Sequence, residues 1–533
     1  MKKLLSASFF SLFASIAFGQ NAPSFDVHLE AQTITNLPGI QSYAAGEHDG
    51  KWLIFGGRLD GLHQRQPWQS FDNAGHNRDV YVIDPTSGNF WHAPLSGIGN
   101  DTLEAQLAAT NPNFVQRDSL LFIVGGYGLD AQSVHITHPL MTVVNVPAMI
   151  QGIVANGSVD TSALASFNHA NFAVTGGKLL MLDTAFMLVG GQQFDGQYNP
   201  MGHNTYTQQY TNEIRRFGVE GTFPSLTVTH HSAVVDTAEL HRRDYNVTYM
   251  TDGQELSINA WSGVFQYNAD LPFLHPVEIS AQHAVAPISS FSQYLNHYHC
   301  PTMSLWEDSS QTMHTVFFGG IAEYYYDDNG TLVHDTDVPF VKTIANVTKK
   351  ANSYTEHKLS AEMPALLGAG AEFFPLENLT YEDANIILLD SVGTDSVHVG
   401  YIYGGISSPA RNVFFGGQTN ASTASPTLYK VYLVKNTSIG LEENAPTKKR
   451  DFGVQLVPNP ASSPLKIAFN TPLENDASLA IYSMDGKKIW SKKRLKEGLS
   501  DFTAHQFSAP AGTYLLKLED ERGGQEVVFI WNN

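Results

Sequence analysis

A short motif recurs through the middle of the sequence: four to six apolar or β-forming residues that end in a pair of glycines. Five clear copies end at Gly56-Gly57, Gly125-Gly126, Gly190-Gly191, Gly319-Gly320 and Gly404-Gly405. A degenerate copy, residues 258–263, lies in the widest gap between the clear ones. A glycine pair lets the end of a strand turn without a Cβ clash while the next unit packs closely against it. The recurrence therefore predicts six similar β units.

Each unit can be filled out as a four-stranded antiparallel sheet, and the first unit is the clearest. Its strands are expected at 41–47, 52–57, 78–84 and 89–91, with turns at 49–50 and 85–88. Apolar residues occupy both faces of 78–84, as in strands that are buried between neighbouring sheets. With 44 glycines and only 15% charged residues, the composition suits many short strands joined by tight turns.

A ring of such sheets must also close on itself. Residues 25–36 alternate apolar and polar side chains and lack a glycine pair, so we expect them to form the outer strand of the sixth sheet. A seventh unit is possible because 412–417 is one more glycine-pair run. It follows Gly404-Gly405 too closely to begin a complete sheet, so six units are preferred.

The first unit also carries the spaced features of a known family. It combines Gly56-Gly57 with Tyr81 and Asp84 on one strand and with Trp91 on the next. In these features it resembles the kelch repeat, whereas the other units keep mainly the glycine pair. The resemblance implies an all-β fold in which residues 25–436 form a six-bladed kelch-like β-propeller, with seven blades possible.

The two ends of the chain predict export. Lys2 and Lys3, an apolar run and the small residues before Gln20 predict a signal peptide over 1–19. No later segment is long and apolar enough to cross a membrane.

The net charge of −20 disfavours nucleic acid or an anionic membrane as a partner. Cys300 is the only cysteine, so an intrachain disulfide is impossible.

The last part of the chain differs from the repeats. A polar, charged linker is expected over 437–452, followed by a compact β unit over 453–533. That unit contains a series of spaced motif residues: Pro458, Asn459, Pro460, Asp485, Gly486, Gly512 and Tyr514. Their order resembles the type A C-terminal sorting domain of type IX secretion substrates. The resemblance implies a small Ig-like β-sandwich, recognition by the type IX secretion machinery, and a secreted or outer-membrane surface location reached through the periplasm.

Ligands of propellers usually bind over the central axis, where loops beside the inner strands converge. We expect ten residues on that rim as ligand-binding candidates: Arg58, Tyr127, His169, Asn171, Gln192, Arg243, Asp244, His297, His299 and Tyr324. Polar donors beside aromatic rings suit a glycan or a peptide. A solvated propeller rim is polar in any case, which is the simpler explanation for these residues.

Two alternatives involve chemistry. His297 and His299 would share one face if their segment is a strand, and they could then hold a metal ion. With Cys300 they faintly resemble galactose oxidase, a kelch enzyme with copper, although its remaining tyrosine and histidine ligands have no counterpart here. Arg243 could clamp a carboxylate, as in sialate-processing kelch propellers. A structural role for the histidine pair beside a buried thiol is favoured.

These observations favour an exported binding module for a glycan or protein partner. No catalytic residue and no cofactor is assigned, and copper enters only under the alternative of a carbohydrate-active propeller enzyme, either a copper oxidase or a sialate-isomerase-like protein.

Overall fold

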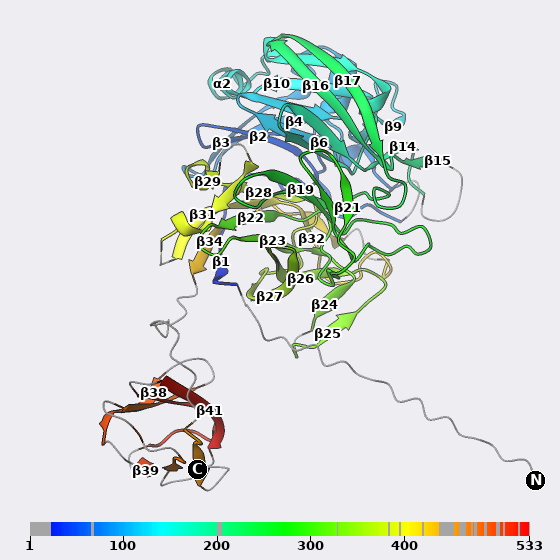
Figure 1. Cartoon of the computed structure of the whole chain (residues 1–533). Helices are drawn as coiled ribbons and strands as arrows, with labels where there is room; N and C mark the ends of the chain where they lie inside the picture. The colour runs from blue at the N-terminus through cyan, green and yellow to red at the C-terminus, as the bar shows by residue number, and fades with distance from the viewer. Residues whose placement is uncertain are drawn as a thin grey trace, which may run out of the picture. The chain divides into compact units, whose positions relative to one another are not determined.

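The structure is a computed structural model, and its strands belong to two compact units, Met1–Lys435 and Asn436–Asn533 (Figure 1). In the first unit it describes residues 23–435, apart from 66–68, 200–204, 328, 382–383, 394–395 and 418–420. In the second it describes 452–531, apart from 458–464, 471–472, 474–476, 484–487, 497–500, 505–506 and 521–522. The signal peptide expected over 1–19 and nearly all of the linker expected over 437–452 lie outside the described residues.

Strands dominate the first unit, and they form six sheets that follow one another along the chain. The first sheet contains β2 (Ala44–His48), β3 (Lys51–Phe55), β4 (Asp79–Asp84) and β5 (Asn89–Pro94). The second contains β6 (Asn113–Arg117), β7 (Leu120–Val124), β10 (Leu140–Asn145) and β11 (Leu164–Asn168). The third contains β12 (Lys178–Leu182), β13 (Ala185–Val189), β16 (Glu213–Thr222) and β17 (Ser225–Val235).

The remaining three sheets continue the same antiparallel pattern, except for one parallel pair between β22 and β30 in the fifth sheet. The fourth contains β18 (Asn246–Thr251), β19 (Leu256–Trp261), β20 (Val277–Ile279) and β21 (Val285–Pro287). The fifth contains β22 (Thr302–Glu307), β23 (Thr312–Ile321), β26 (Phe340–Lys350) and β27 (Ser353–Glu362), and β30 (Ile386–Leu388) and β29 (Thr380–Tyr381) extend it beyond β22. The sixth contains β28 (Ala371–Pro375), β31 (Ser396–Gly404), β34 (Leu428–Lys435) and β1 (Phe25–Gln32).

Helices and short hairpins occupy the connections. Two α-helices occur in the part of the chain that the structure describes, α1 (Asp101–Leu107) and α2 (Val146–Asn156). Four hairpins begin within a few residues after a glycine pair: β8 (Tyr127–Leu129) with β9 (His135–Thr137), β14 (Gln192–Gly196) with β15 (Tyr206–Tyr210), β24 (Tyr324–Tyr326) with β25 (Leu332–His334), and β32 (Ile406–Ser407) with β33 (Thr423–Ala424). They place additional loops where the second strand of the second, third, fifth and sixth sheets finishes.

The N-terminal strand completes the sixth sheet, as predicted. β1 pairs with β34 in an unbroken antiparallel register that runs from Phe25 opposite Lys435 to Gln32 opposite Leu428. The first and last strands of this unit are therefore hydrogen-bonded to each other, and the outer edge of the sixth sheet is supplied by the start of the chain. The extra glycine-pair run 412–417 lies in turns and contributes no strand, which removes the sequence argument for a seventh unit.

The glycine pairs share one backbone conformation. Both residues of each of the five clear pairs have positive φ, for example 66° and 92° at Gly125 and Gly126. The degenerate copy adopts the same conformation, with φ of 51° at Ser262 and 96° at Gly263. A Cβ atom built on Gly125 would lie 2.0 Å from the Val174 carbonyl oxygen, so the next sheet packs directly on this backbone. The left-handed conformation and the close approach together explain why glycine recurs here.

Ser262 is the exception to the glycine rule, and its replacement by glycine should stabilise the protein. The serine is fully buried, its hydroxyl has no hydrogen-bond partner in the described chain, and its φ is positive. We expect Ser262→Gly to raise the free energy of unfolding by about 1 kcal/mol in urea denaturation, since it relieves both costs. Gly190→Ser is the reciprocal control, and it should destabilise because a Cβ there would lie 2.6 Å from the Tyr245 hydroxyl. A destabilised Ser262→Gly variant would contradict this account.

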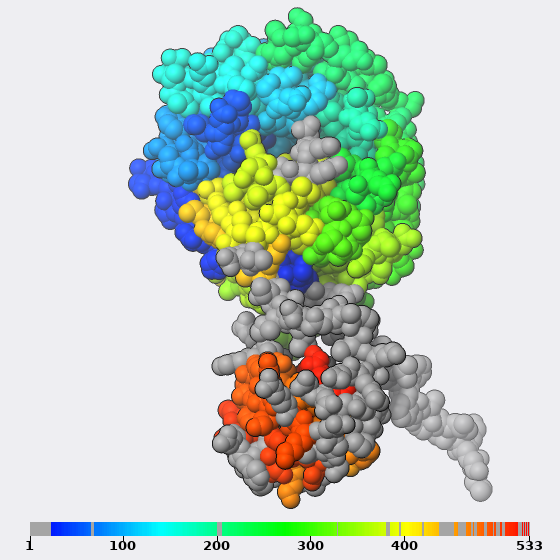
Figure 2. All heavy atoms as spheres, turned by 60° about the vertical axis from the view of Figure 1, so that its left-hand side comes forward, coloured from blue at the N-terminus to red at the C-terminus, as the bar shows by residue number. Residues whose placement is uncertain are grey.

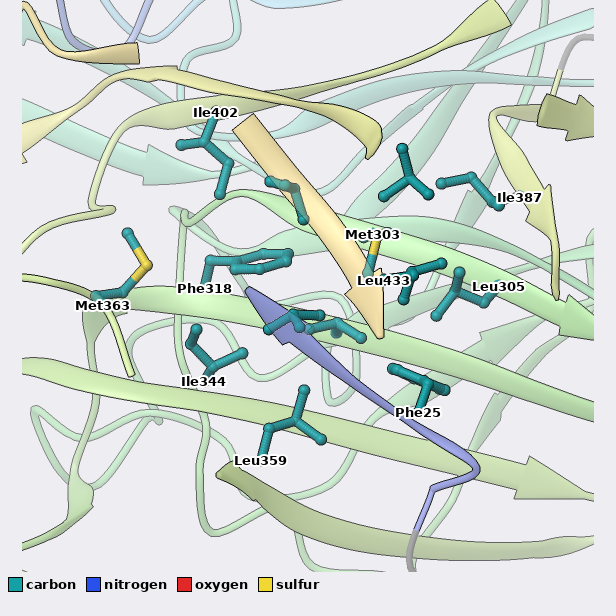
Figure 3. Close-up of a cluster of buried hydrophobic side chains, with 14 of the residues drawn as sticks. Phe25, Met303, Leu305, Phe318, Ile344, Leu359, Met363, Ile387, Ile402 and Leu433 are labelled. Atoms are coloured by element: carbon teal, nitrogen blue, oxygen red, sulfur yellow. The ribbon is translucent and has the colours of Figure 1, made fainter. Parts of the chain in front are cut away.

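Each sheet packs face to face on the next, and each interface is a cluster of buried side chains. Leu53 packs with Ile123 between the first and second sheets, Phe122 with Phe186 between the second and third, and Met187 with Ile258 between the third and fourth. The ring centroids of Trp261 and Phe317 lie 5.5 Å apart, between the fourth and fifth sheets. Phe318, Ile344, Ile402 and Leu433 lie between the fifth and sixth sheets (Figure 3).

The sixth sheet also packs on the first. Trp52 of β3 stacks on Phe374 of β28, with 4.1 Å between the ring centroids, and Tyr403 joins the same cluster. In Figure 2 the blue atoms of the first sheet accordingly lie beside the yellow and orange atoms that end this unit. The cycle of contacts thus returns to its starting point through residues more than 300 positions apart.

The second unit contains two sheets around one core. A three-stranded sheet has β35 (Gln455–Val457), β36 (Leu465–Ala468) and β39 (Asp501–Ala504). A four-stranded sheet has β37 (Ala477–Ser483), β38 (Lys488–Leu495), β40 (Gly512–Asp520) and β41 (Gly523–Trp531). Ile467, Ile481 and Leu516 belong to one buried cluster, so the two sheets share an apolar interior.

The sorting-motif residues fall partly on this unit. Tyr514 is buried, and its hydroxyl donates to the Pro510 carbonyl at 2.8 Å. Gly512 begins β40. Pro458, Asn459, Pro460, Asp485 and Gly486 lie outside the described residues.

Candidate functional site

Six residues with positive φ stand at equivalent positions, just before the first strand of each sheet. They are Ser42, Asn111, Gly176, Asp244, His299 and Gly370, with φ between 41° and 71°. Backbone hydrogen bonds connect them in sequence around the sheets: Ser42 N–H to Gly370 O at 2.7 Å, Asn111 to Ser42 at 2.8 Å, Gly176 to Asn111 at 3.3 Å, Asp244 to Gly176 at 2.7 Å, and Gly370 to His299 at 2.8 Å. We call these six residues the axial circle.

The axial circle surrounds a small polar cavity to which all six sheets contribute. Its walls include Ser42, Asn111, Asp244, His299 and Glu372. The cavity has a volume of about 10 Å³, which is room for about one water molecule. The site is therefore a tightly packed polar centre, far smaller than the pockets that enclose sugars or peptides.

Asp244 is held by two neighbours. Its Oδ1 accepts a hydrogen bond of 2.6 Å from the Asn111 amide, and its Oδ2 accepts one from Arg243 Nη1. Arg243 also donates from Nε to the Tyr210 hydroxyl at 3.0 Å. Burial lowers the pKa of Arg243, but the Asp244 carboxylate and Tyr210 outweigh this effect and raise it above the usual range. The guanidinium is thus permanently charged and is compensated within the chain.

A second pair of charged groups also lines the cavity. Glu372 Oε1 lies 3.4 Å from Lys178 Nζ and 4.0 Å from His299 Nε2. Burial and the Lys178 charge lower the pKa of His299, although Glu372 and Asp244 act in the other direction. These contacts pair Glu372 with Lys178 beside a neutral imidazole, so the charges of the cavity are satisfied among its own residues.

Three of the predicted rim residues are near the axis but buried. Arg58 is 1% exposed, Tyr127 4% and Gln192 7%. Arg58 Nε donates to Asp60 Oδ1 at 2.7 Å, and the Tyr127 hydroxyl donates to the Gly196 carbonyl at 2.7 Å. Gln192 Oε1 accepts from Gln208 at 2.5 Å. Apart from Arg58 Nη1, which is buried without a hydrogen-bond partner among the described residues, the polar groups named here are engaged by the chain itself.

Aromatic loop residues cover this end of the axis. His63 stacks on Phe71 with 5.1 Å between ring centroids, and it contacts the rings of Tyr198 and Phe414 edge to face. Burial, followed by the nearby Arg243 and Arg58 charges, lowers the pKa of His63 to about 4. The imidazole is therefore neutral at pH 7, and the loops pack over the predicted rim.

The structure does not bring the other rim candidates to the same place. His169 stacks on His230 of the outer strand β17, with 3.8 Å between centroids, and the Asn171 carbonyl accepts from Arg215 of β16 at 3.0 Å. Tyr324 lies on the β24–β25 hairpin, where it stacks on His334. Arg243, Asp244 and His299 are the candidates that meet at the axis.

The predicted metal pair does not form one site. Residues 297–299 are not a strand, and His299 has a φ of 41°, so the two-residue alternation that would align the imidazoles does not apply. His299 lines the axial cavity, whereas His297 is 0% exposed and neither of its ring nitrogens has a partner in the described chain. Within the described ranges, no group of three or more His, Cys, Asp or Glu residues is placed to hold a metal ion.

Cys300 is part of the apolar interior. The thiol belongs to the cluster between the fourth and fifth sheets, and its Sγ accepts from the Asn246 amide at 3.5 Å. Burial raises the pKa of this thiol to about 12. It is therefore protonated at neutral pH and unreactive as a nucleophile, in agreement with the structural role favoured from the sequence.

The buried imidazole of His297 should make stability dependent on pH. Burial lowers its pKa to about 3, whereas the unfolded value is about 6.5. The unfolded chain then takes up a proton that the folded chain does not, so stability present above pH 6.5 is lost as the pH falls from 6.5 toward 3. Between pH 7 and pH 5 we expect the wild type to lose about 2 kcal/mol more free energy of unfolding than His297→Gln. Urea denaturation at both pH values measures these losses, and His48→Gln, at a partly exposed histidine, is the control. Equal losses in the wild type and in His297→Gln would contradict the prediction.

The sequence analysis missed Lys178 and Glu372, which pair across the axial cavity. Each lies within two residues of an axial-circle residue, near the start of the first strand of its sheet. Aligning the units by their first strands, instead of by the glycine pairs alone, would have drawn attention to these positions.

Comparison with known proteins identifies the C-terminal unit. Residues 455–530 match the family model described as a secretion system C-terminal sorting domain, which confirms that prediction. This domain indicates export through the type IX secretion system to the cell surface or the extracellular space. Among the described residues, none of the helices has the length and apolar character that crossing a membrane requires.

Solved structures that align with most of this chain include distant likenesses. No curated protein was found to match the sequence. The structure described as "Structure of YjhT" aligns with 12% identity and a TM-score of 0.40, covering 74% of this chain and 97% of that one. A GH43 β-xylosidase/α-arabinofuranosidase from a compost microbial metagenome aligns with 11% identity and a TM-score of 0.31, covering 75% and 92%. A GH43_1 enzyme from Xanthomonas citri aligns with 11% identity and a TM-score of 0.29, covering 76% and 89%. Likenesses this weak carry no argument about activity.

Proposed function

We propose that the chain is an exported binding module. In this proposal residues 1–19 are a signal peptide, 25–436 form a six-bladed kelch-like β-propeller, 437–452 are a linker, and 453–533 are an Ig-like type IX sorting domain. The propeller binds a glycan or protein partner outside the cell.

The packing of the first unit supports the propeller. Each of the six sheets shares a buried cluster with the one before it and the one after it, including the sixth with the first. Five backbone hydrogen bonds connect the axial circle in the same order. The kelch-like features also lie as that family would place them, with Tyr81 and Asp84 on β4 and Trp91 on β5.

One observation carries the binding role: the axis is filled by groups that satisfy one another. Arg243 is paired with Asp244 and Lys178 with Glu372, around a cavity of about 10 Å³. A substrate would have to displace these pairs, which would leave buried charges uncompensated. We therefore place partner recognition on the outward-facing loops and grooves, with the polar centre as a structural support.

A binding screen with the full chain tests this proposal. The exported protein is immobilised and exposed to extracellular polysaccharides and purified envelope proteins. We expect saturable binding of at least one class, and equal binding by Asp244→Asn, whose amide retains the oxygen that Asn111 contacts. Binding of nothing in the panel would contradict the binding role. Loss of binding in a folded Asp244→Asn variant would return recognition to the axis.

A further inference from the structure

The outer edge of the third sheet differs from the outer edges of the other five sheets. It is formed by β17, which pairs with β16 on one side, whereas no described strand pairs with its other side. β16 and β17 lie side by side as a long hairpin (Figure 1). Alternate residues of such an edge direct their N–H and C=O groups away from the sheet, where a further strand can bind.

β17 lacks most of the features that protect an edge strand from pairing, which are charged side chains, proline and short length. It spans eleven residues, Ser225–Val235, without Asp, Glu, Lys, Arg or Pro. Among the other outer strands, β27 and β1 carry charged residues, β5 and β21 end in proline, and β11 has only five residues. Of the six outer edges described, the third sheet therefore presents the one that is both long and uncharged.

The regular part of β17 is complementary to a second copy of itself. A shift in its register with β16 falls at Ser232 and Ala233, so the regular part runs from 225 to 231. Val228 is its midpoint, and antiparallel pairing about a two-fold axis at Val228 uses this whole part in both copies. Thr227 of each copy then lies opposite Thr229 of the other. Both threonines are exposed, and threonine pairs across neighbouring strands are favourable.

Exposed apolar side chains lie at the end of β17. Val235 is 64% exposed and Tyr267 58%, the two highest values among the exposed large apolar residues of the described chain. They are close together, because the Tyr267 hydroxyl donates to the Thr237 carbonyl at 2.7 Å, two residues beyond β17. In the same two-fold register, the turn at 223–224 of one copy comes opposite residues 232–233 of the other. A second copy therefore brings the apolar turn residues Phe and Pro toward this surface.

The absence of charge favours a second copy of this chain as the occupant. A second copy repeats the net charge of −20, and two such molecules approach most easily where neither presents a charge. A strand of another protein is selected by charged groups or by side-chain pockets, and β17 has no charged residue with which to select one.

We propose that the chain forms a two-fold dimer in which the free edges of two β17 strands pair in antiparallel orientation. The two third sheets, with four strands each, then become one continuous sheet across the dimer. This inference goes beyond the proposed function and does not depend on which partner the protein binds.

Sedimentation velocity of the full chain over a range of concentrations tests the dimer. We expect the wild type to reach the mass of two chains. Thr227→Lys combined with Thr229→Lys places ammonium groups opposite each other across the two-fold axis, and it should raise the dissociation constant of the dimer more than about tenfold. Thr86→Lys combined with Asn89→Lys adds the same charge at exposed positions of the first sheet and should leave the dimer unchanged. Urea denaturation of both double variants verifies that they fold.

A cysteine at the two-fold axis provides a second measurement. In the proposed register residue 228 lies opposite itself, so Val228→Cys should form a disulfide between two chains under mild oxidation. Val134→Cys is the control, because Val134 is 53% exposed and lies far from β17 along the chain. Cys300 does not interfere, since it is buried and burial raises the pKa of its thiol to about 12. We expect the dimer to cross-link at least tenfold faster at position 228 than at position 134.

Three results would overturn the proposal. A wild type that stays monomeric at every concentration has no such dimer. A dimer that the lysine substitutions at 227 and 229 leave unchanged, or equal cross-linking at positions 228 and 134, would place the interface elsewhere. Capture of another protein that is lost in the lysine variant of a monomeric chain would assign the edge to a foreign strand instead. The proposed binding function is tested separately, because the binding screen can succeed with a monomer.

Discussion

Gly125→Ala is expected to destabilise the first unit by about 4 kcal/mol or to prevent its folding. An alanine at a φ of 66° costs about 1–2 kcal/mol in backbone conformation. Its Cβ would also lie 2.0 Å from the Val174 carbonyl oxygen and 2.7 Å from that of Phe172. These are backbone atoms, which no side-chain rotation can move away, so the second and third sheets must separate locally.

Gly88→Ala is the matched control for this prediction. Gly88 has a similar φ of 70°, but a Cβ there meets nothing within 4 Å. This control therefore isolates the cost of the left-handed backbone conformation. We expect Gly88→Ala to lower the free energy of unfolding by about 1 kcal/mol. Urea denaturation followed by tryptophan fluorescence measures both variants. Similar losses in the two variants would show that close packing between the sheets is not what the glycine pair serves.

Removal of residues 436–533 is expected to abolish export completely. Residues 455–530 match the secretion system C-terminal sorting domain, which indicates export through the type IX secretion system, and they belong to a compact unit separate from Met1–Lys435. The shortened chain should therefore accumulate in the periplasm with its sheets intact. Immunoblots of medium, surface and periplasmic fractions in a host with this secretion system measure the effect, and resistance to limited proteolysis verifies folding.

The complementary experiment transfers the C-terminal unit to another protein and tests whether this unit is sufficient for export. Residues 436–533 are joined to the end of a reporter that is normally retained in the periplasm, and the reporter should then reach the surface or the medium. A truncated chain that is still exported would show that the first unit carries its own export information. A reporter that stays in the periplasm would show that the C-terminal unit is not sufficient.

Local features of the fold could be predicted from the sequence. The glycine pairs mark the ends of second strands because a positive φ is a property of the residue itself, and even Ser262-Gly263 takes that conformation. The alternation of β1 was sufficient to predict its pairing, which covers eight residue pairs with β34. The sorting domain was predicted from the resemblance of its spaced motifs to a known family, and the family match over 455–530 confirms it.

The candidate site could be predicted only in part. Arg58 and Tyr127 follow glycine pairs, as expected for rim residues, but loops that carry His63, Tyr198 and Phe414 pack over the same end of the axis. His169 precedes a first strand by several residues, and its ring stacks instead on the outer strand β17. Loop length and direction decide these positions, and neither has a residue pattern that reveals it.

By itself, then, the sequence determined where strands end, which unit is repeated and which segment directs export, because each depends on residues close together along the chain. Only the tertiary structure decided which charges meet at the centre. Asn111 and Asp244 are 133 positions apart, and Lys178 and Glu372 are 194 apart. Contacts over such separations depend on how six sheets pack in succession, so they follow from the shape of the whole unit and not from any local pattern.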